Sequence, residues 1–269
     1  IPISHRRLTM DETNAFVSKL FNLHGKRVLL TGASSGLGLH FSSTLARAGA
    51  HVILASRSVD KLDALAATIQ KDGGSCEACA LDVRSRDAIR ACIERLEADA
   101  PLDVLVNNAG IAVVKAPQHL SDDDWDAVYE TNLRGAWVLS QELIKRRLAD
   151  GGECSIINIA SVLGLRGIGH VAPYAAAKAG LINVGRDLST DLAHKGIRIN
   201  AIAPGYIETE MNRDWLKTDG GERLRAKIPA RRFGQPSDLD GALLYFASDA
   251  SRYTNAAVVA IDGGFSSAL

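Results

Sequence analysis

The chain has no excess of charge of either sign, because its 31 lysines and arginines balance its 31 aspartates and glutamates. A balanced surface lacks the positive field that attracts nucleic acid or an anionic membrane. The sequence also lacks an apolar run of about 20 residues, which a membrane helix needs, and a basic-then-apolar secretory pattern at its start. We therefore expect a cytoplasmic protein that binds small molecules, with no nucleic-acid or membrane partner.

Cysteine is scarce, with four residues at positions 76, 79, 92 and 154. Cys76 and Cys79 form a C-x2-C pair, but neither a second such pair nor a histidine pair stands at the spacing of a zinc site. The two residues fall in an expected strand, where side chains three positions apart point to opposite faces. We therefore expect no metal, and we interpret the cysteines as small buried apolar residues.

No linker rich in proline, glycine and serine and no repeat divides the chain, so we expect one domain over residues 25–269. Residues 1–24 are expected to form a loosely held N-terminal arm with a short helix at 12–20. In the domain, apolar segments alternate with segments of helical pattern. The expected strands are 27–31, 51–56, 77–81, 103–107, 155–160, 198–203 and 258–261. The expected helices are 37–48, 59–71, 86–98, 123–149 and 173–194, with others within 209–226 and 236–248.

Strands that are apolar throughout, each followed by a helix, predict a parallel sheet covered on both faces. Right-handed crossovers make it an α/β, doubly wound Rossmann-type sheet of about seven strands. Such sheets bind ligands at the carboxyl ends of their strands. Several unusual stretches fall at those ends, among them 34–38, 56–57, 82–83, 107–110, 161 and 204–209.

Three glycines follow the first strand at the spacing G-x3-G-x-G: Gly32, Gly36 and Gly38. Glycine allows a sharp turn and a close approach of the backbone to a ligand. The first amides of the next helix have no partner within the helix and carry partial positive charge, which suits a phosphate. An ordinary strand-to-helix turn would use the same residues.

Tyr174 and Lys178 are four residues apart on one expected helix, so they share a face. A nearby cation favours the phenolate and lowers a tyrosine pKa, which permits proton exchange with an alcohol or carbonyl oxygen near neutral pH. Ser161, just beyond a strand, can donate a hydrogen bond to the same oxygen. The alternatives are a surface Tyr/Lys pair, a helix-capping Ser161 and, at position 132, an asparagine inside a helix.

The motifs together resemble those of the short-chain dehydrogenase/reductase family in its single-domain form, including members that act on 3-oxoacyl groups and on gluconate. They are TGASSGLG at 31–38, NNAG at 107–110, Asn132, Ser161, YAAAK at 174–178, PGYIET at 204–209 and DGG at 262–264. One departure is Thr-Asn-Ala-Ala at 254–257, where the family often has a glycine; asparagine is the next best residue for a positive φ.

The resemblance implies roles for individual residues. Tyr174 would be the general acid/base, Ser161 would position the substrate oxygen, Lys178 would hold the nicotinamide ribose and tune Tyr174, and Asn132 would support a water that relays protons. The implied cofactor contacts are Gly32, Ser34, Ser35, Gly36, Leu37, Gly38, Ser56, Arg57, Asp82, Val83, Asn108, Ala109, Gly110, Tyr174, Lys178, Pro204, Gly205, Ile207 and Thr209. Among these, Asp82 and Val83 would contact the adenine and 108–110 would form the wall beside the adenine ribose. Ile207 and Thr209 would contact the nicotinamide carboxamide. The function implied is a nicotinamide-dependent oxidoreductase that interconverts a secondary alcohol and a ketone.

A catalytically silent dinucleotide-binding regulatory or scaffold protein is the alternative function, because a fold alone does not fix chemistry. Candidate substrate-pocket residues are Leu163, Gly164, Ile168, His170, Tyr206 and the segment 211–216, with Met211 and Trp215. His170 is also interpretable as a loop residue that faces water. Relatives are commonly homotetramers built through two long helices, here 123–149 and 173–194, so we expect a homo-oligomer, tetramer or dimer.

The end of the second strand decides the cofactor. An acidic residue there would accept a hydrogen bond from the ribose 2′-hydroxyl of NAD and would repel a 2′-phosphate. This chain has Ser56 at that place and Arg57 beside it, whose planar guanidinium can pair with phosphate. NADP(H) is therefore preferred, with NAD(H) possible, since Arg57 could instead solvate the next helix and Ser35 stands where many NADP-dependent members have a basic residue.

Overall fold

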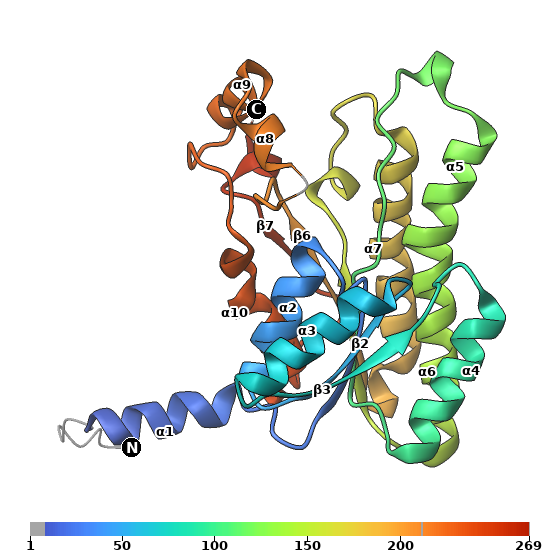
Figure 1. The fold of residues 1–269 in the computed structure, drawn as a ribbon, viewed down its shortest axis with the longest axis vertical. Coiled ribbons are helices and arrows are strands. Elements are labelled where there is room, and N and C mark those ends of the chain that lie inside the picture. The colour runs from blue at the N-terminus through green and yellow to red at the C-terminus, as the bar shows by residue number, and fades with distance from the viewer. Residues whose placement is uncertain (1–8, 211, 269) are drawn as a thin grey trace.

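The computed structural model of the chain describes residues 9–210 and 212–268, and these are built around a seven-stranded parallel sheet (Figure 1). The strands are β1 Arg27–Thr31, β2 His51–Ser56, β3 Ser75–Ala80, β4 Val104–Asn107, β5 Cys154–Ile159, β6 Ile197–Pro204 and β7 Val258–Ile261. Their order is β3-β2-β1-β4-β5-β6-β7, so the sheet grows in both directions from β1 and β4. The doubly wound Rossmann-type sheet predicted from the sequence is confirmed.

Helices cover both faces of the sheet, as its apolar strands require. One face packs against α2 Gly36–Arg47, α3 Val59–Lys71 and α10 Asp240–Ala247, and the other against α4 Arg86–Asp99, α6 Gly135–Asp150 and α7 Ala172–Leu192 (Figure 1). Alternate residues of β1 enter the two cores: Val28 and Leu30 join Phe41 of α2, whereas Leu29 joins Ile93 of α4.

The expected helix 123–149 is interrupted in the structure. It consists of α5 Asp122–Tyr129, a π-helical turn Glu130–Arg134 and α6. Ser121 starts α5 as a capping box, because its hydroxyl accepts a hydrogen bond from the Asp124 amide while the Asp124 carboxylate accepts from the Ser121 amide. Such π turns are frequent at functional sites. The expectation of one continuous helix was wrong at this turn, which holds Asn132.

In the loop before β7, the residue with a positive φ is not the one that we expected. The residue with positive φ is Ala256, at +59°, and not Asn255. The Asn255 side chain instead accepts a hydrogen bond from the Ile199 amide at 2.7 Å and donates one to the Ile197 carbonyl at 3.2 Å. Asn255 thus continues the pairing of β6 where glycine is common in the family.

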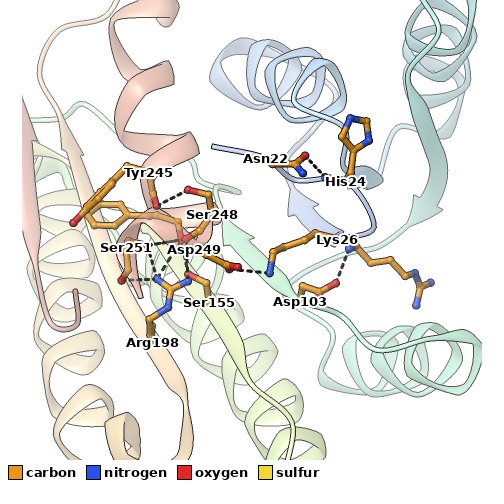
Figure 2. Close-up of polar contacts among 12 residues, drawn as sticks. Asn22, His24, Lys26, Asp103, Ser155, Arg198, Tyr245, Ser248, Asp249 and Ser251 are labelled. Atoms are coloured by element: carbon orange, nitrogen blue, oxygen red, sulfur yellow. Dashed lines mark hydrogen bonds and ion pairs between the residues drawn. The ribbon is translucent and has the colours of Figure 1, made fainter. Parts of the chain in front are cut away.

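The amino ends of the strands are held by polar contacts (Figure 2). Arg198 of β6 donates hydrogen bonds to Ser251, Lys26 lies 3.1 Å from Asp249, and the Arg27 amide donates to the Asp103 carboxylate at 2.8 Å. Arg198, Lys26 and Asp103 therefore each have a partner within the chain.

A short helix, α1 Met10–Leu20, precedes the sheet and extends away from the body of the molecule (Figure 1). Phe16 and Val17 are exposed on it, whereas Leu23 is fully buried. The helix expected at 12–20 is confirmed and begins two residues earlier; the division into an arm and a domain stays a prediction. Within the described ranges, no helix combines the length and the apolar character needed to cross a membrane.

Candidate active site

The glycine-rich turn joins β1 to α2 at the carboxyl edge of the sheet. Gly32 has a φ of +68°, and a Cβ added to it would lie 2.9 Å from the Cα of Ala109. A Cβ at Gly38 would lie 2.0 Å from the carbonyl oxygen of Gly32, so the helix could not approach the strand with any other residue there.

The start of α2 leaves its amides available to a ligand. Ser35 is the N-cap, with extended backbone, and its side chain makes no capping hydrogen bond. Gly36 has a φ of +53°, and an added Cβ would have nothing within 4 Å among the described residues. Ser34 and Leu37 are half-buried and Ser35 is exposed. The turn therefore offers open space and partial positive charge to an anion.

The end of β4 is bonded to this turn. The hydroxyl of Thr31 accepts hydrogen bonds from the amides of Asn108 and Ala109 at 3.0 and 3.1 Å. The Asn108 side chain donates to the Thr31 carbonyl at 2.9 Å. These bonds hold the wall at 108–110 beside the glycine turn, where the family resemblance implies the adenine ribose.

Asn132 is positioned by the π turn and is buried. Its side-chain oxygen accepts from the amide of Ile111, and its side-chain nitrogen donates to the carbonyl of Ile111, both at 2.8 Å. A Cβ on Gly110 would lie 3.4 Å from the Asn132 oxygen and 3.6 Å from Lys178 Nζ. Asn132 thus holds Ile111, directly after the wall at 108–110, close to Lys178. The role of Asn132 in a proton relay stays a prediction.

Ser161, Tyr174 and Lys178 converge at the end of β5. The Ser161 hydroxyl lies close enough to Tyr174 to lower the pKa of that residue, and its Oγ accepts a hydrogen bond from the Leu163 amide at 3.1 Å. Lys178 Nζ lies 5.7 Å from the centroid of the Tyr174 ring and donates to the Ile159 carbonyl at 2.6 Å. The sequence placed these three residues together, and the structure brings them together.

The pKa values of this group correct one expectation. Burial raises the pKa of Tyr174 above its ordinary value of 10.0, and the nearby Ser161 hydroxyl opposes that rise only in part. Burial lowers the pKa of Lys178 from 10.5 to about 8. The lowered tyrosine pKa expected from a neighbouring cation is therefore wrong for the protein without cofactor, because Lys178 directs its ammonium at the Ile159 carbonyl and its own charge is destabilised.

The end of β2 carries an available cation. Arg57 is exposed and makes no side-chain hydrogen bond or ion pair with any described residue, although its charge helps to keep the pKa of Asp82 low. The pKa of Asp82 is lowered despite partial burial, chiefly by hydrogen bonds from Arg84. Ser56 accepts from the Ser58 amide at 3.2 Å.

Val83 lies next to Asp82 at the end of β3. It packs against the start of α6, since a Cβ on Gly135 would lie 2.5 Å from the Val83 carbonyl oxygen. The loop that carries the predicted adenine contacts is therefore fixed on the helix beside it.

The segment after β6 is fixed by its own bonds. The Gly205 amide donates to the Ile261 carbonyl at 2.9 Å, and a Cβ on Gly205 would lie 2.6 Å from the Cα of Asp262. Beyond Pro204, the side chain of Asn212 binds the Ile207 carbonyl and the Thr209 amide at 2.9 and 2.8 Å. Asn212 thus holds the residues expected to contact the nicotinamide carboxamide, a contact that the sequence did not suggest.

The predicted pocket residues separate into two groups. Leu163 and Tyr206 pack in an apolar cluster with Phe265, whose ring lies 5.4 Å from that of Tyr206. His170 and Trp215 are exposed instead, and His170 has a strained φ of +60°.

The other predicted pocket residues also differ in burial. Gly164 packs against the backbone of α7 at Lys178 and Ala179. Ile168 is exposed, whereas Leu216 is buried. Met211 lies outside the described residues.

Sequence reasoning missed the contact that closes this cluster. Arg166 donates to the carbonyls of Phe265 and Ala268 at 2.6 and 3.1 Å, and its guanidinium lies 5.0 Å from the Phe265 ring centroid. The C-terminal turn Phe265–Ser267 is thereby attached to the loop after Ser161. An arginine five residues after the serine gave no local sequence signal.

These residues fit a dinucleotide. Lys178 is 4% exposed and has one hydrogen-bond acceptor among the described residues, so two of its three N–H groups remain for the hydroxyls of a ribose. The uncapped start of α2 and the open space at Gly36 fit a pyrophosphate, and Arg57 is free to meet a further phosphate.

Comparisons with known proteins agree with this geometry. A family model described as enoyl-(acyl carrier protein) reductase matches residues 32–266. The chain is 37% identical to 3-oxoacyl-acyl-carrier-protein reductase of Thermotoga maritima over 90% of this chain and 98% of that protein, and 35% identical to gluconate 5-dehydrogenase of Gluconobacter oxydans over 93% and 98%. A gluconate 5-dehydrogenase from Burkholderia cenocepacia, solved with NADP and tartrate, superposes with a TM-score of 0.89 at 35% identity and covers 94% of this chain and all of that one. The chain therefore belongs to the short-chain dehydrogenase/reductase family of oxidoreductases.

Proposed function

We propose that the protein interconverts a secondary alcohol and a ketone with a nicotinamide dinucleotide, and that Tyr174 is its general acid/base. The observation that carries this proposal is the convergence of Ser161, Tyr174 and buried Lys178 beside the glycine turn. The nicotinamide, when bound, supplies or accepts the hydride. The hydroxyl of Tyr174 gives a proton to the carbonyl oxygen in reduction and takes it back in oxidation.

The other polar residues act on position and charge. Ser161 donates a hydrogen bond to the reacting oxygen and fixes it next to Tyr174. Lys178 holds the ribose, and hydroxyls around its ammonium would replace the water it has lost. That solvation raises the fraction of charged lysine and so favours the phenolate of Tyr174. Asn132 keeps the wall segment at Ile111 in place.

A variant of Tyr174 tests this mechanism. Tyr174→Phe removes the transferable proton and keeps the ring, so turnover should fall by about 10²-fold or more while NADPH affinity stays within about twofold. Leu163 flanks the site without a proton to transfer, and Leu163→Ala serves as the matched control that should retain measurable turnover. A Tyr174→Phe enzyme with near-normal turnover would contradict the mechanism, whereas one that no longer binds NADPH would show that the hydroxyl is needed to build the cofactor site.

The substrate class can be tested in the same assay. The chain is similar to a 3-oxoacyl-acyl-carrier-protein reductase and to a gluconate 5-dehydrogenase. The reactions in these two names each interconvert a secondary alcohol and a ketone. We propose a substrate of one of these two classes. Steady-state rates with a 3-oxoacyl thioester and with a 5-ketoaldonate, each with NADPH and NADH, separate the classes through kcat/KM. No turnover with either class under any cofactor would contradict this assignment.

The proposed cofactor is NADP(H), with NAD(H) also accepted. Arg57 has no competing side-chain partner among the described residues, Ser56 supplies a hydroxyl instead of a carboxylate, and solved relatives carry NADP. Loss of a charged hydrogen bond in Arg57→Ala should weaken NADPH binding by about 1.5 kcal/mol, or about tenfold, because Arg57 is exposed. NADH binding should change little.

A neighbouring arginine gives the control for that measurement. Arg84 is also exposed, but it is already bonded to Asp82. Arg84→Ala removes one charge from the same edge without removing the proposed phosphate contact, so it should weaken NADPH binding less than Arg57→Ala does. Equal weakening of NADPH and NADH in Arg57→Ala, or tighter wild-type binding of NADH, would exclude NADP preference and leave the oxidoreductase proposal standing.

A further inference from the structure

Two buried cysteines meet away from the active site. Cys79 on β3 and Cys92 on α4 are each 6% exposed, and their sulfur atoms lie 3.2 Å apart. Cys76 lies in the core on the other face of the sheet, as its spacing from Cys79 predicts. The sequence gave no sign of the pair because its members lie on different elements and meet only through the packing of α4 on the sheet.

The surroundings of Cys79 favour a thiolate. Arg95 donates a hydrogen bond to Cys79 Sγ at 3.6 Å and lies 3.9 Å from the Glu77 carboxylate. The hydrogen bond from Cys92 lowers the pKa of Cys79, burial opposes this, and Arg95 lowers it further; the same contact and burial raise the pKa of Cys92. Because Arg95 donates its hydrogen bond to Cys79, Cys79 is the better nucleophile of the pair.

The pair also lies at the edge of the sheet, beside a side chain that is exposed to solvent. β3 is the edge strand of the sheet, and the side chain of Arg95 beside the pair is 55% exposed. By contrast, Cys154 belongs to β5, an interior strand, and burial raises its pKa to about 12. Position and charge thus separate Cys79 and Cys92 from the remaining thiols.

We propose that Cys79 and Cys92 form a reversible disulfide when the protein meets a peroxide. The thiolate of Cys79 attacks one peroxide oxygen, the O–O bond breaks, and water leaves after protonation, so that Cys79 becomes a sulfenic acid. The sulfur of Cys92 then displaces the hydroxyl group as a second water and forms the S–S bond. Two thiols are oxidised, one peroxide is reduced to two waters, and a dithiol reductant reverses the reaction.

The bond would connect the two ends of the segment that carries Asp82 and Val83. If these residues contact adenine, as the proposed function implies, the disulfide would tie the adenine end of the site to α4. The formation of the bond itself does not depend on that function, so it can be tested without an activity assay.

The test is peptide mapping of the full-length protein after oxidation. Reduced protein is treated with hydrogen peroxide, the remaining thiols are alkylated in denaturant, and the chain is digested with trypsin without reduction. Residues 72–84 and 91–95 should appear as one cross-linked species, lighter than the two peptides by about two hydrogen masses. Cys154 should be recovered alkylated. Treatment with a dithiol after the oxidation and before the alkylation should restore two separate peptides.

Variants assign the bond to its residues. Peptide 72–84 contains both Cys76 and Cys79, so Cys76→Ala should keep the cross-link. Cys92→Ala should abolish it and leave a sulfenic acid on Cys79 that a 1,3-diketone reagent traps. Arg95→Gln should slow cross-linking several-fold in the folded protein. A cross-link through Cys76 or Cys154, one between two chains, or four thiols that stay reduced in the folded wild type would each overturn the proposal.

Discussion

Lys178 should destabilise the protein near neutral pH when no cofactor is bound. The lysine is 4% exposed, and its ammonium donates to one carbonyl, that of Ile159, with no acidic partner among the described residues. A buried charge with so little compensation costs folding free energy. Lys178→Met keeps most of the side-chain volume and removes the charge, so it isolates this cost.

The magnitude follows from the two pKa values of Lys178. The folded value is about 8 and the ordinary value is 10.5. Between them the unfolded chain binds more protons than the folded chain, so the lysine's contribution to stability rises with pH through this window and is lost as pH falls through about 8. At about 1.4 kcal/mol per pKa unit, the charge costs about 3 kcal/mol at pH 7 and about 1.4 kcal/mol at pH 9.5. The difference between these conditions is about 2 kcal/mol.

Denaturant unfolding of wild type and Lys178→Met, both without cofactor, measures this change. The variant's stability relative to wild type should fall by about 2 kcal/mol between pH 7 and pH 9.5, because the wild type gains stability that the variant cannot gain. Loss of the hydrogen bond to the Ile159 carbonyl changes the variant's free energy of unfolding by the same amount at both pH values. Lys71→Met, which removes an exposed lysine of α3, is the control for the loss of one positive charge. A pH-independent difference for Lys178→Met would refute the reasoning.

Three further predictions concern the site, the glycine turn and the assembly. Without cofactor, the tyrosinate absorbance that Tyr174→Phe removes should titrate above pH 10, since burial raises the pKa of Tyr174; titration below that value would show that Lys178 already acts on it. Gly38→Ala should lower the free energy of unfolding by about 3 kcal/mol because its Cβ would meet backbone, whereas Gly73→Ala, with positive φ but open space, should cost about 1 kcal/mol; equal losses in calorimetry would contradict the clash. Light scattering at micromolar concentration should give a dimer or tetramer, and a monomer alone would exclude assembly through the helices at 122–150 and 172–192.

The sheet was predictable because its signals are local. Short apolar runs such as 51–56 and 197–204 are fully or nearly fully buried, and each is followed by a segment with helical spacing. The π turn was not predictable, since one extra residue in a helical turn barely changes the apolar pattern on either side of it. Yet this turn orients Asn132 toward Ile111.

The site was predictable in its residues but not in its charges. Tyr174 and Lys178 are close because four residues on a helix bring them to one face. Whether the cation lowers the tyrosine pKa depends on burial and on the direction of the ammonium, which are set by the Ile159 carbonyl on another element. The contacts of Arg166 and Asn212 likewise depend on how the C-terminal turn and the segment after β6 pack, so residue spacing could not reveal them.

A buried cation lies at each edge of the sheet, and the two cations differ in how many hydrogen-bond acceptors surround them. This difference indicates where a ligand would bind. At the amino edge, burial lowers the pKa of Arg198, but its guanidinium donates to the carbonyls of Phe246 and Ser251 and to the Ser251 hydroxyl (Figure 2). At the carboxyl edge, Lys178 is more deeply buried and has one described acceptor. Since a buried charge is stable only when its hydrogen bonds are made, the first cation completes the fold, whereas the second needs acceptors from outside the chain. On the proposed function, ribose hydroxyls would supply such acceptors, and cofactor binding would then recover part of the free energy that the buried Lys178 charge costs in the free protein.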